Sequence, residues 1–196
     1  MFVLGLTGSI GMGKTTVAAM FRCQKIPVYD ADAGVHQLLA PGGAAVPAVR
    51  NAFPGVVRDG GVDRQALGKI VFDDPQILAW LESILHPLVR KRQTAFLRLS
   101  AGHRRRLVVL DIPLLFETGA DATCDAVAVV SAPLYLQRLR VLGRSGMTAE
   151  KFSSILARQM SDLEKRRQAD FIIPTGLGRR FSLLSIQKII KVICER

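Results

Sequence analysis

The sequence has no long apolar run. Although 49% of its 196 residues are hydrophobic, no stretch approaches the roughly 20 apolar residues that a membrane-spanning helix needs. The apolar run at residues 2–6 is interrupted by Gly5 and is too short for a secretory signal peptide. We therefore expect a soluble, cytoplasmic protein with no membrane partner, folded as a single domain over residues 1–196.

Cysteine is scarce, and its spacing fits no metal motif. Cys23, Cys124 and Cys194 lie far apart, are odd in number, form no C-x-x-C pair and are not accompanied by a histidine pair. This pattern argues against the usual zinc-binding and disulfide frameworks. We expect three reduced thiols with structural roles.

Aromatic residues are also few, at 6%, whereas basic residues are abundant. Lys and Arg outnumber Asp and Glu by 27 to 16, which gives a formal charge of +11. Such a charge favours an anionic partner: nucleic acid, a membrane surface or a phosphorylated small molecule. The basic residues fall in separate clusters with few interleaved aromatics, and no nucleic-acid-binding signature is evident. We expect no nucleic-acid partner.

Asparagine occurs only once, at Asn51. A guanine-binding site of the N-K-x-D type is therefore absent. This absence argues against a GTP-binding switch, whatever phosphate-binding loop the chain contains.

A phosphate-binding loop stands near the start of the chain. The segment "GSIGMGKTT" (residues 8–16) follows an apolar strand and precedes a helix-like segment, and it matches G-x-x-x-x-G-K-[ST] in full. Glycines let backbone N–H groups close around a phosphate, and the next helix presents its positive end to the same anion. Lys14 is expected at the β- and γ-phosphates, and the Thr15 hydroxyl is expected to bind magnesium.

Four later apolar runs complete a predicted parallel sheet. Each is short and separated from the next by helix-like sequence, which is typical of an α/β fold. They cover residues 26–30, 106–113, 125–133 and 169–174. Ligands are then expected at the carboxyl ends of the strands.

Two further segments interrupt this core, which we expect over residues 1–30, 106–133 and 169–196. Residues 31–105 lack a comparable strand pattern and include a helix-like stretch at 73–100, so they predict an inserted helical subdomain. Residues 134–168 are helical in pattern, rich in arginine and broken by "GRSGMT". This pattern suits a lid that closes over phosphates.

Acidic residues follow two of the predicted strands. Asp30 and Asp32 end the second run, and either can serve as the base for an acceptor hydroxyl or can cap the next helix. Asp32 is the stronger catalytic candidate. Asp111 ends the third run, where a carboxylate can hold a magnesium-bound water. For Asp111 and for Glu117, the alternative is a strand-end or helix-start carboxylate without a catalytic role.

Arginines in the predicted lid can bind the transferring phosphoryl group through their guanidinium forks, or they can simply be solvated. The candidates are Arg138, Arg140, Arg144 and Arg158. The basic clusters at 90–92 and 103–106 leave the same two alternatives. His86 precedes Pro87, where either a helix-breaking structural role or a substrate contact is possible.

Together these segments resemble the dephospho-coenzyme A kinase family. In the family's order, the chain has "LGLTGSIGMGKTTVA", "VYDADAGVH", "VDRQALGKIVF", "LESILHPLV", "LDIPLLFE", "VVSAPLYLQRLR" and "RQMSDLEKRRQADFII". The P-loop is shared widely, but "DAD", "DR" before "IVF", "HP" and "PLLFE" are together close to diagnostic. The residues alone do not exclude another small-molecule kinase, such as a nucleoside monophosphate kinase.

The resemblance implies the P-loop kinase fold: a three-layer α/β sandwich with a five-stranded parallel sheet, an inserted helical substrate subdomain and a helical lid. It also implies a reaction. ATP, with Mg²⁺, would phosphorylate the ribose 3′-hydroxyl of dephospho-coenzyme A to give coenzyme A and ADP, the final step of coenzyme A biosynthesis.

The resemblance also assigns roles to residues. Asp32 becomes the base, with Lys14, Arg138 and Arg144 as the other catalytic candidates. Residues 31–105 become the coenzyme A subdomain, with Arg64, His86, Asp32 and Asp111 as candidate substrate contacts. Thr15 binds magnesium, with Asp111 acting through water. The ATP loop comprises Gly11, Met12, Gly13, Lys14, Thr15 and Thr16.

The chain departs from the family pattern in two places. The family often has Asn-x-Gly near the adenine pocket, where this chain has Pro174-Thr175-Gly176, so the contacts to the base stay open. Ser9 and Met12 replace a frequent glycine and serine of the P-loop. We do not expect these two to disturb the phosphate cradle.

Overall fold

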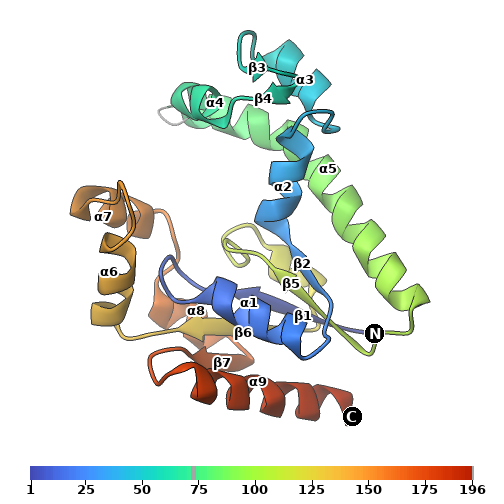
Figure 1. The fold of residues 1–196 in the computed structure, drawn as a ribbon, viewed down its shortest axis with the longest axis vertical. Coiled ribbons are helices and arrows are strands. Elements are labelled where there is room, and N and C mark those ends of the chain that lie inside the picture. The colour runs from blue at the N-terminus through green and yellow to red at the C-terminus, as the bar shows by residue number, and fades with distance from the viewer. Residues whose placement is uncertain (72–73, 196) are drawn as a thin grey trace. The chain divides into compact units, whose positions relative to one another are not determined.

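The computed structural model describes residues 1–71 and 74–195 (Figure 1). These residues form two compact units, which we call the sheet unit (Met1–Tyr29 and Ser100–Arg196) and the inserted unit (Asp30–Leu99). Three positions that the sequence singled out lie outside the described residues: Phe72 of "VDRQALGKIVF", Asp73 at the start of the expected helix, and Arg196 at the end of the expected core.

A five-stranded parallel sheet organises the sheet unit. Four strands lie within the apolar runs that predicted them, and β1 extends one residue beyond its run, to Thr7. In sheet order the strands are β2 (Val28–Asp30), β5 (Leu107–Asp111), β1 (Phe2–Thr7), β6 (Ala126–Ser131) and β7 (Phe171–Pro174). The central strand β1 pairs with β5 and β6 in parallel, and Leu6 lies opposite Asp111. The carboxyl ends of β1 and β5 therefore meet at one edge.

Helices cover both faces of this sheet (Figure 1). The helices of the sheet unit are α1 (Lys14–Cys23), η1 (Ala120–Thr123), α6 (Leu134–Leu142), α7 (Ala149–Ala157), α8 (Asp162–Gln168) and α9 (Arg179–Cys194), of which α6 and α7 stand beside the sheet. Successive strand residues point to opposite faces. In β6, Ala128 and Val130 share a core cluster with residues of α1 and α9, whereas Val127 and Val129 pack with Leu115 on the other face. The three-layer α/β sandwich is as predicted.

The segment after β6 forms three helices with a break where the sequence placed it. Gly146, with φ of 75°, lies in the turn between α6 and α7. Thr148 caps α7 by accepting a hydrogen bond from the Lys151 N–H, and Ser161 with Glu164 forms a capping box at α8. These caps satisfy N–H groups that a helix start would otherwise leave open.

The inserted unit has a hydrophobic core of its own. Its elements are α2 (Ala31–Leu39), α3 (Val46–Ala52), β3 (Val57–Arg58), β4 (Gly61–Val62), α4 (Arg64–Val71) and α5 (Pro75–Gly102), the last of which runs into the sheet unit. Val49, Phe53, Leu67 and Leu85 are among the buried residues of this core.

The hairpin of β3 and β4 was not predicted. Each strand has only two residues, too few for an alternating pattern to show. The signal lay in the dipeptide Asp59-Gly60, whose φ values of 50° and 76° are both positive, as the tight I′ hairpin turn requires.

The helix-breaking role considered for Pro87 is wrong. Pro87 lies inside α5, which continues for another fifteen residues to Gly102. A proline inside a helix costs about 3 kcal/mol. Burial of Leu81 and Leu85, with Leu88 packed against the same core, offsets this cost. No helix among the described residues, α5 included, is both long and apolar enough to cross a membrane.

Candidate active site

The loop between β1 and α1 has the backbone that a phosphate cradle needs. Gly11 and Gly13 have φ of 76° and 95°, a region that residues with a side chain rarely adopt. At Gly8 a Cβ atom would lie 2.6 Å from a carbonyl oxygen of β6. The side chains of Ser9 and Met12, which depart from the family pattern, are buried in the protein. The cradle is therefore lined by backbone.

Several N–H groups of this loop have no acceptor among the described residues, including those of Gly11, Gly13, Lys14 and Thr15. The last two begin α1, whose N-cap is a glycine and whose first turn contains no acidic residue. The positive end of the helix dipole is therefore uncompensated by the helix's own side chains. Open N–H groups and the dipole together favour an anion here.

The P-loop lysine pairs with the acid at the end of β5. Lys14 Nζ lies 2.7 Å from Asp111 Oδ1, and the exposed fractions of the two side chains are 16% and 3%. Asp111 reaches this position because its strand neighbours β1, which leads directly into the loop. Lysine and carboxylate thus share one strand edge, the place where a phosphate and its magnesium ion are expected.

The two acids after β2 have different environments. Asp30 is the N-cap of α2, and its Oδ1 accepts a hydrogen bond of 2.9 Å from the Ala33 N–H. The capping alternative therefore holds for Asp30. Asp32 lies in the first turn of the same helix with an exposed side chain. It is thus accessible to a substrate without being needed as the cap.

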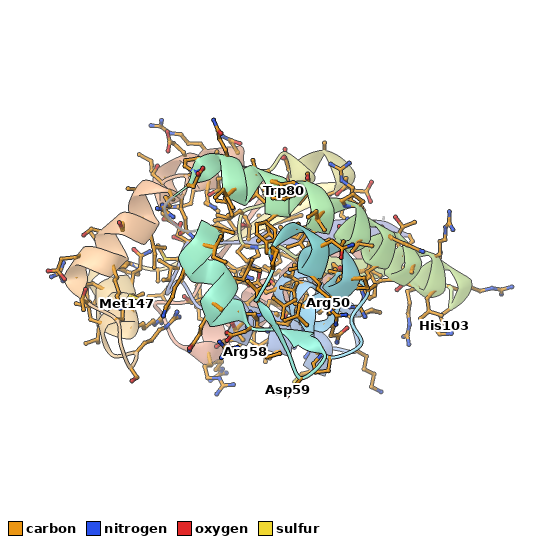
Figure 2. The ribbon with its side chains drawn as sticks, turned by 90° about the horizontal axis from the view of Figure 1, so that it is seen from above. Arg50, Arg58, Asp59, Trp80, His103 and Met147 are labelled. Carbon is orange, nitrogen blue, oxygen red and sulfur yellow. The ribbon has the colours of Figure 1, made fainter. Side chains whose placement is uncertain are left out.

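A pocket of about 510 Å³ opens in the inserted unit between α2 and the hairpin. Its lining includes His36, Arg58, Asp63 and Arg64. Figure 2 shows Arg58 and Asp59 at the end of the hairpin. Arg64 Nη1 lies 3.5 Å from His36 Nδ1. The Ala66 N–H, which donates to Asp63, holds the pKa of that carboxyl below its usual value. The carboxylate consequently stays charged beside the arginines.

The other residues that the sequence suggested as substrate or phosphate contacts do not line this pocket. His86 is exposed on α5 and does not line this pocket. Arg92, from the basic cluster at 90–92, donates to the Gly34 carbonyl at 3.2 Å and so links α5 to α2. The cluster at 103–106 is exposed in the turn before β5. For these two clusters the structure favours the structural and solvated alternatives.

The lid arginines do not behave alike. Arg138 and Arg144 are exposed, the first on α6 and the second just beyond it. Arg140 instead points into the protein, where it donates to Thr175 O at 2.8 Å and to Thr175 Oγ1 at 3.1 Å. Its position three residues after the buried Gln137 places both on one face of α6.

Comparison with known proteins supports the resemblance. The family model described as dephospho-CoA kinase matches residues 2–176. The chain belongs to the dephospho-CoA kinase family. Among curated family members, the dephospho-CoA kinase of Rhodospirillum rubrum is 55% identical over 94% of this chain and 88% of its own length. That of Novosphingobium aromaticivorans is 51% identical over 100% and 96%.

Solved structures share the fold of this chain. TT1252 from Thermus thermophilus has a TM-score of 0.83 and 35% identity, covering 97% of this chain and 96% of its own. Dephospho-CoA kinase from Campylobacter jejuni has a TM-score of 0.66 and 23% identity with the same coverage. Shikimate kinase from Acinetobacter baumannii, at 19% identity and a TM-score of 0.52, shares the fold alone and covers 100% and 94%.

The predicted fold and enzyme class are confirmed by membership in the dephospho-CoA kinase family. The chain is a kinase that acts on a hydroxyl group, in the final step of coenzyme A biosynthesis. The alternative of another small-molecule kinase is excluded, because the family match covers most of the chain.

An ion pair joins a buried lysine of α8 to Glu117, whose side chain is 17% exposed. Lys165 of α8 is fully buried, and its Nζ lies 2.8 Å from Glu117 Oε1. The same carboxylate oxygen accepts a hydrogen bond from the Met160 N–H at 2.9 Å. Partial burial raises the pKa of Glu117, but the bonds from Lys165 and the backbone outweigh it and lower the pKa below its usual 4.5. Glu117 is thus a structural carboxylate.

We expect Glu117→Gln to lower the free energy of unfolding by about 3 kcal/mol, because it leaves the buried Lys165 ammonium without its counter-ion. The measurement is urea denaturation at pH 7. The matched control is Glu164→Gln, which alters an exposed carboxylate of the neighbouring capping box and should change stability much less.

The pH dependence provides a second readout. Because the folded-state pKa is lowered, the contribution of Glu117 is present above pH 4.5 and is lost as pH falls through the lower folded-state value. The difference between wild type and Glu117→Gln should therefore shrink below pH 4.5. A difference that stays constant down to pH 3 would count against this role.

Proposed function

We propose that this chain transfers the γ-phosphoryl group of ATP to the ribose 3′-hydroxyl of dephospho-coenzyme A, releasing ADP and coenzyme A. The observation that carries the proposal is the open P-loop with its Lys14–Asp111 pair, in a chain of the dephospho-CoA kinase family. The loop supplies N–H donors and a lysine, the groups that bind and polarise a nucleotide triphosphate.

In the proposed mechanism, the open N–H groups of Gly11, Gly13, Lys14 and Thr15 hold the phosphates of ATP. Lys14 stabilises the charge that develops on the transferring group. Asp111 holds the ammonium at the end of β5 in advance, so less reorganisation is needed when the nucleotide binds. Arg138 and Arg144, both exposed, are the proposed lid contributions to the same phosphates.

The acceptor side of the proposal rests on the inserted unit. Asp32 takes the proton of the 3′-hydroxyl, which strengthens the attacking oxygen. Arg64, in the pocket with His36, is a cationic group suited to the phosphates of dephospho-coenzyme A. His86 keeps its candidate role as a substrate contact outside that pocket.

The donor set also fits a magnesium ion. Thr15 is exposed in the first turn of α1, and Asp111 supplies the neighbouring carboxylate. No group of three metal-binding side chains exists among the described residues. Mg²⁺ commonly uses one or two protein oxygens and completes its shell with water and phosphate oxygens. When bound, it neutralises phosphate charge; Thr15 and Asp111 would hold it.

A coupled ADP-release assay tests the proposal. The acceptors compared are dephospho-coenzyme A, a set of nucleoside monophosphates and no acceptor, each with magnesium or with EDTA. We expect ADP release only with dephospho-coenzyme A and magnesium. Equal rates without an acceptor, or faster release with a nucleoside monophosphate, would overturn the assignment.

We further propose the segment roles predicted from the sequence. Residues 1–30, 106–133 and 169–196 form the core, residues 31–105 form a coenzyme A subdomain, and residues 134–168 form a lid. The cytoplasmic location and the lack of a nucleic-acid partner stay predictions. Cell fractionation and salt-dependent retention on DNA are their respective tests.

Hydrogen bonds near both ends of the proposed lid hold it to the rest of the sheet unit, so we expect only the residues between these bonds to move. Gln137 donates to the Ile10 carbonyl, Arg140 binds Thr175, and Gln159 accepts from the Ile10 N–H. We expect ATP with dephospho-coenzyme A to slow amide exchange in residues 143–157 and to leave residues 137–141 nearly unchanged. Exchange that is unaffected throughout 134–168 would count against a lid.

A further inference from the structure

Three side chains far from the P-loop in sequence bind its carbonyl oxygens. Gln137 Nε2 donates to Ile10 O at 2.8 Å, and Arg140 Nη1 lies 3.4 Å from Gly11 O. Thr175 Oγ1 donates to Met12 O at 2.6 Å. Three consecutive carbonyls of the loop are thus held by α6 and by the segment after β7.

These bonds fix the direction of the N–H groups as well. A peptide group is planar and trans, so its C=O and N–H point in opposite directions. When Thr175 holds Met12 O, the N–H of Gly13 must point the other way, and Gln137 does the same for Gly11 through Ile10 O. These are two of the N–H groups that have no acceptor among the described residues.

Of the three residues, Thr175 is held by hydrogen bonds from its backbone as well as its side chain. Its N–H donates to Ser131 O at 2.9 Å, and its own carbonyl accepts from Arg140 Nη2 at 2.8 Å. Its hydroxyl accepts from Arg140 Nη1 while it donates to Met12 O. Ser131 O lies 3.4 Å from the same hydroxyl, so Met12 O is the nearer of its two acceptors. Oγ1 would lie only 3.3 Å from a Cβ at Gly13, so the loop packs directly against it.

We propose that Thr175, together with Gln137, is a positioning residue that aims the Gly13 and Gly11 N–H groups at the nucleotide phosphates. The segment 174–176, where the sequence left the contacts to the base open, thereby acts on the phosphate end of ATP through the loop. This inference rests on the proposed use of ATP at the P-loop. It concerns binding and orientation of the nucleotide and leaves the acceptor side unaffected.

The test uses Thr175→Val, which keeps the shape and removes the hydroxyl, and Thr175→Ser, which keeps the hydroxyl. Kd for ATP and KM for both substrates are measured in each, with Tm as the check on folding. We expect Thr175→Val to weaken ATP binding about tenfold, because Met12 O loses its donor and the peptide is freed. KM for dephospho-coenzyme A should hardly change, and Thr175→Ser should recover most of the affinity.

Two more variants separate positioning from general stability. Ser100→Ala removes another buried hydroxyl, which lies near the end of α5 and outside both the P-loop and the segment 174–176. It should lower Tm without weakening ATP binding. Gln137→Met changes a different element and should also weaken ATP binding without affecting KM for dephospho-coenzyme A. If Thr175→Val does not fold, this variant alone tests the positioning role.

The inference is overturned if Thr175→Val and Gln137→Met bind ATP like wild type. It is also overturned if Thr175→Ser loses as much affinity as Thr175→Val, or if Ser100→Ala weakens ATP binding equally. Failure of the wild-type protein to bind ATP would instead remove the proposed function itself.

Discussion

Replacing Lys14 with methionine should reduce turnover by about 10³-fold, the scale seen when a preorganised donor to the transition state is lost. Methionine keeps most of the side-chain volume, so the loss reports the ammonium rather than a cavity. The change also affects the fold, because Asp111 is only 3% exposed and its carboxylate lies 2.7 Å from the lysine. Removing one partner of such a pair costs about 3 kcal/mol.

The two effects can be separated with Asp111→Asn. In the double variant Lys14→Met with Asp111→Asn, no unpaired buried charge remains, so Tm should rise again relative to Lys14→Met alone. Turnover should stay low, since the ammonium is still missing. Recovery of activity together with stability would show that Lys14 acts only by holding Asp111, and it would remove Lys14 from the catalytic mechanism.

Asp32→Asn should abolish most of the phosphorylation of dephospho-coenzyme A, with a loss of about 10³-fold in kcat, because the amide cannot accept the hydroxyl proton. ATP affinity and Tm should stay near wild type, since Asp32 is exposed in the first turn of α2 and the P-loop belongs to the sheet unit. The measurements are turnover and ATP affinity in one preparation.

The structure supplies a matched control two residues earlier. Asp30 is the N-cap of α2, and asparagine caps a helix about as well as aspartate. Asp30→Asn should therefore keep both stability and turnover. If Asp30→Asn loses activity while Asp32→Asn keeps it, the base role moves to Asp30. If neither variant changes turnover, then neither Asp30 nor Asp32 accepts the proton of the 3′-hydroxyl.

Features encoded by adjacent residues were predictable from the sequence. The strands appear as apolar runs because they are buried on both faces, as in β6, where every residue from Ala126 to Ser131 is buried. The P-loop was recognisable because each required residue type stands at a fixed spacing. The break between α6 and α7 followed from its glycines for the same reason.

Features that depend on distant residues were not predictable. Lys165 stands in the polar segment "DLEKRRQ", which reads as a solvated helix, yet it is fully buried beside Glu117. The contact between Arg140 and Thr175 joins residues 35 positions apart, and no local pattern marks either residue. The continuity of α5 through Pro87 likewise depends on core packing, which overrides the local preference.

The separate core of the inserted unit has an evolutionary consequence. Val49, Phe53, Leu67 and Leu85 pack with one another rather than in the core formed by the sheet and its helices. Substitutions around the pocket of His36 and Arg64 are therefore absorbed within this module. Under the proposed assignment of this pocket to the acceptor, acceptor preference can be redesigned there while the residues that bind the nucleotide stay unchanged, so selection can act on the two substrates independently.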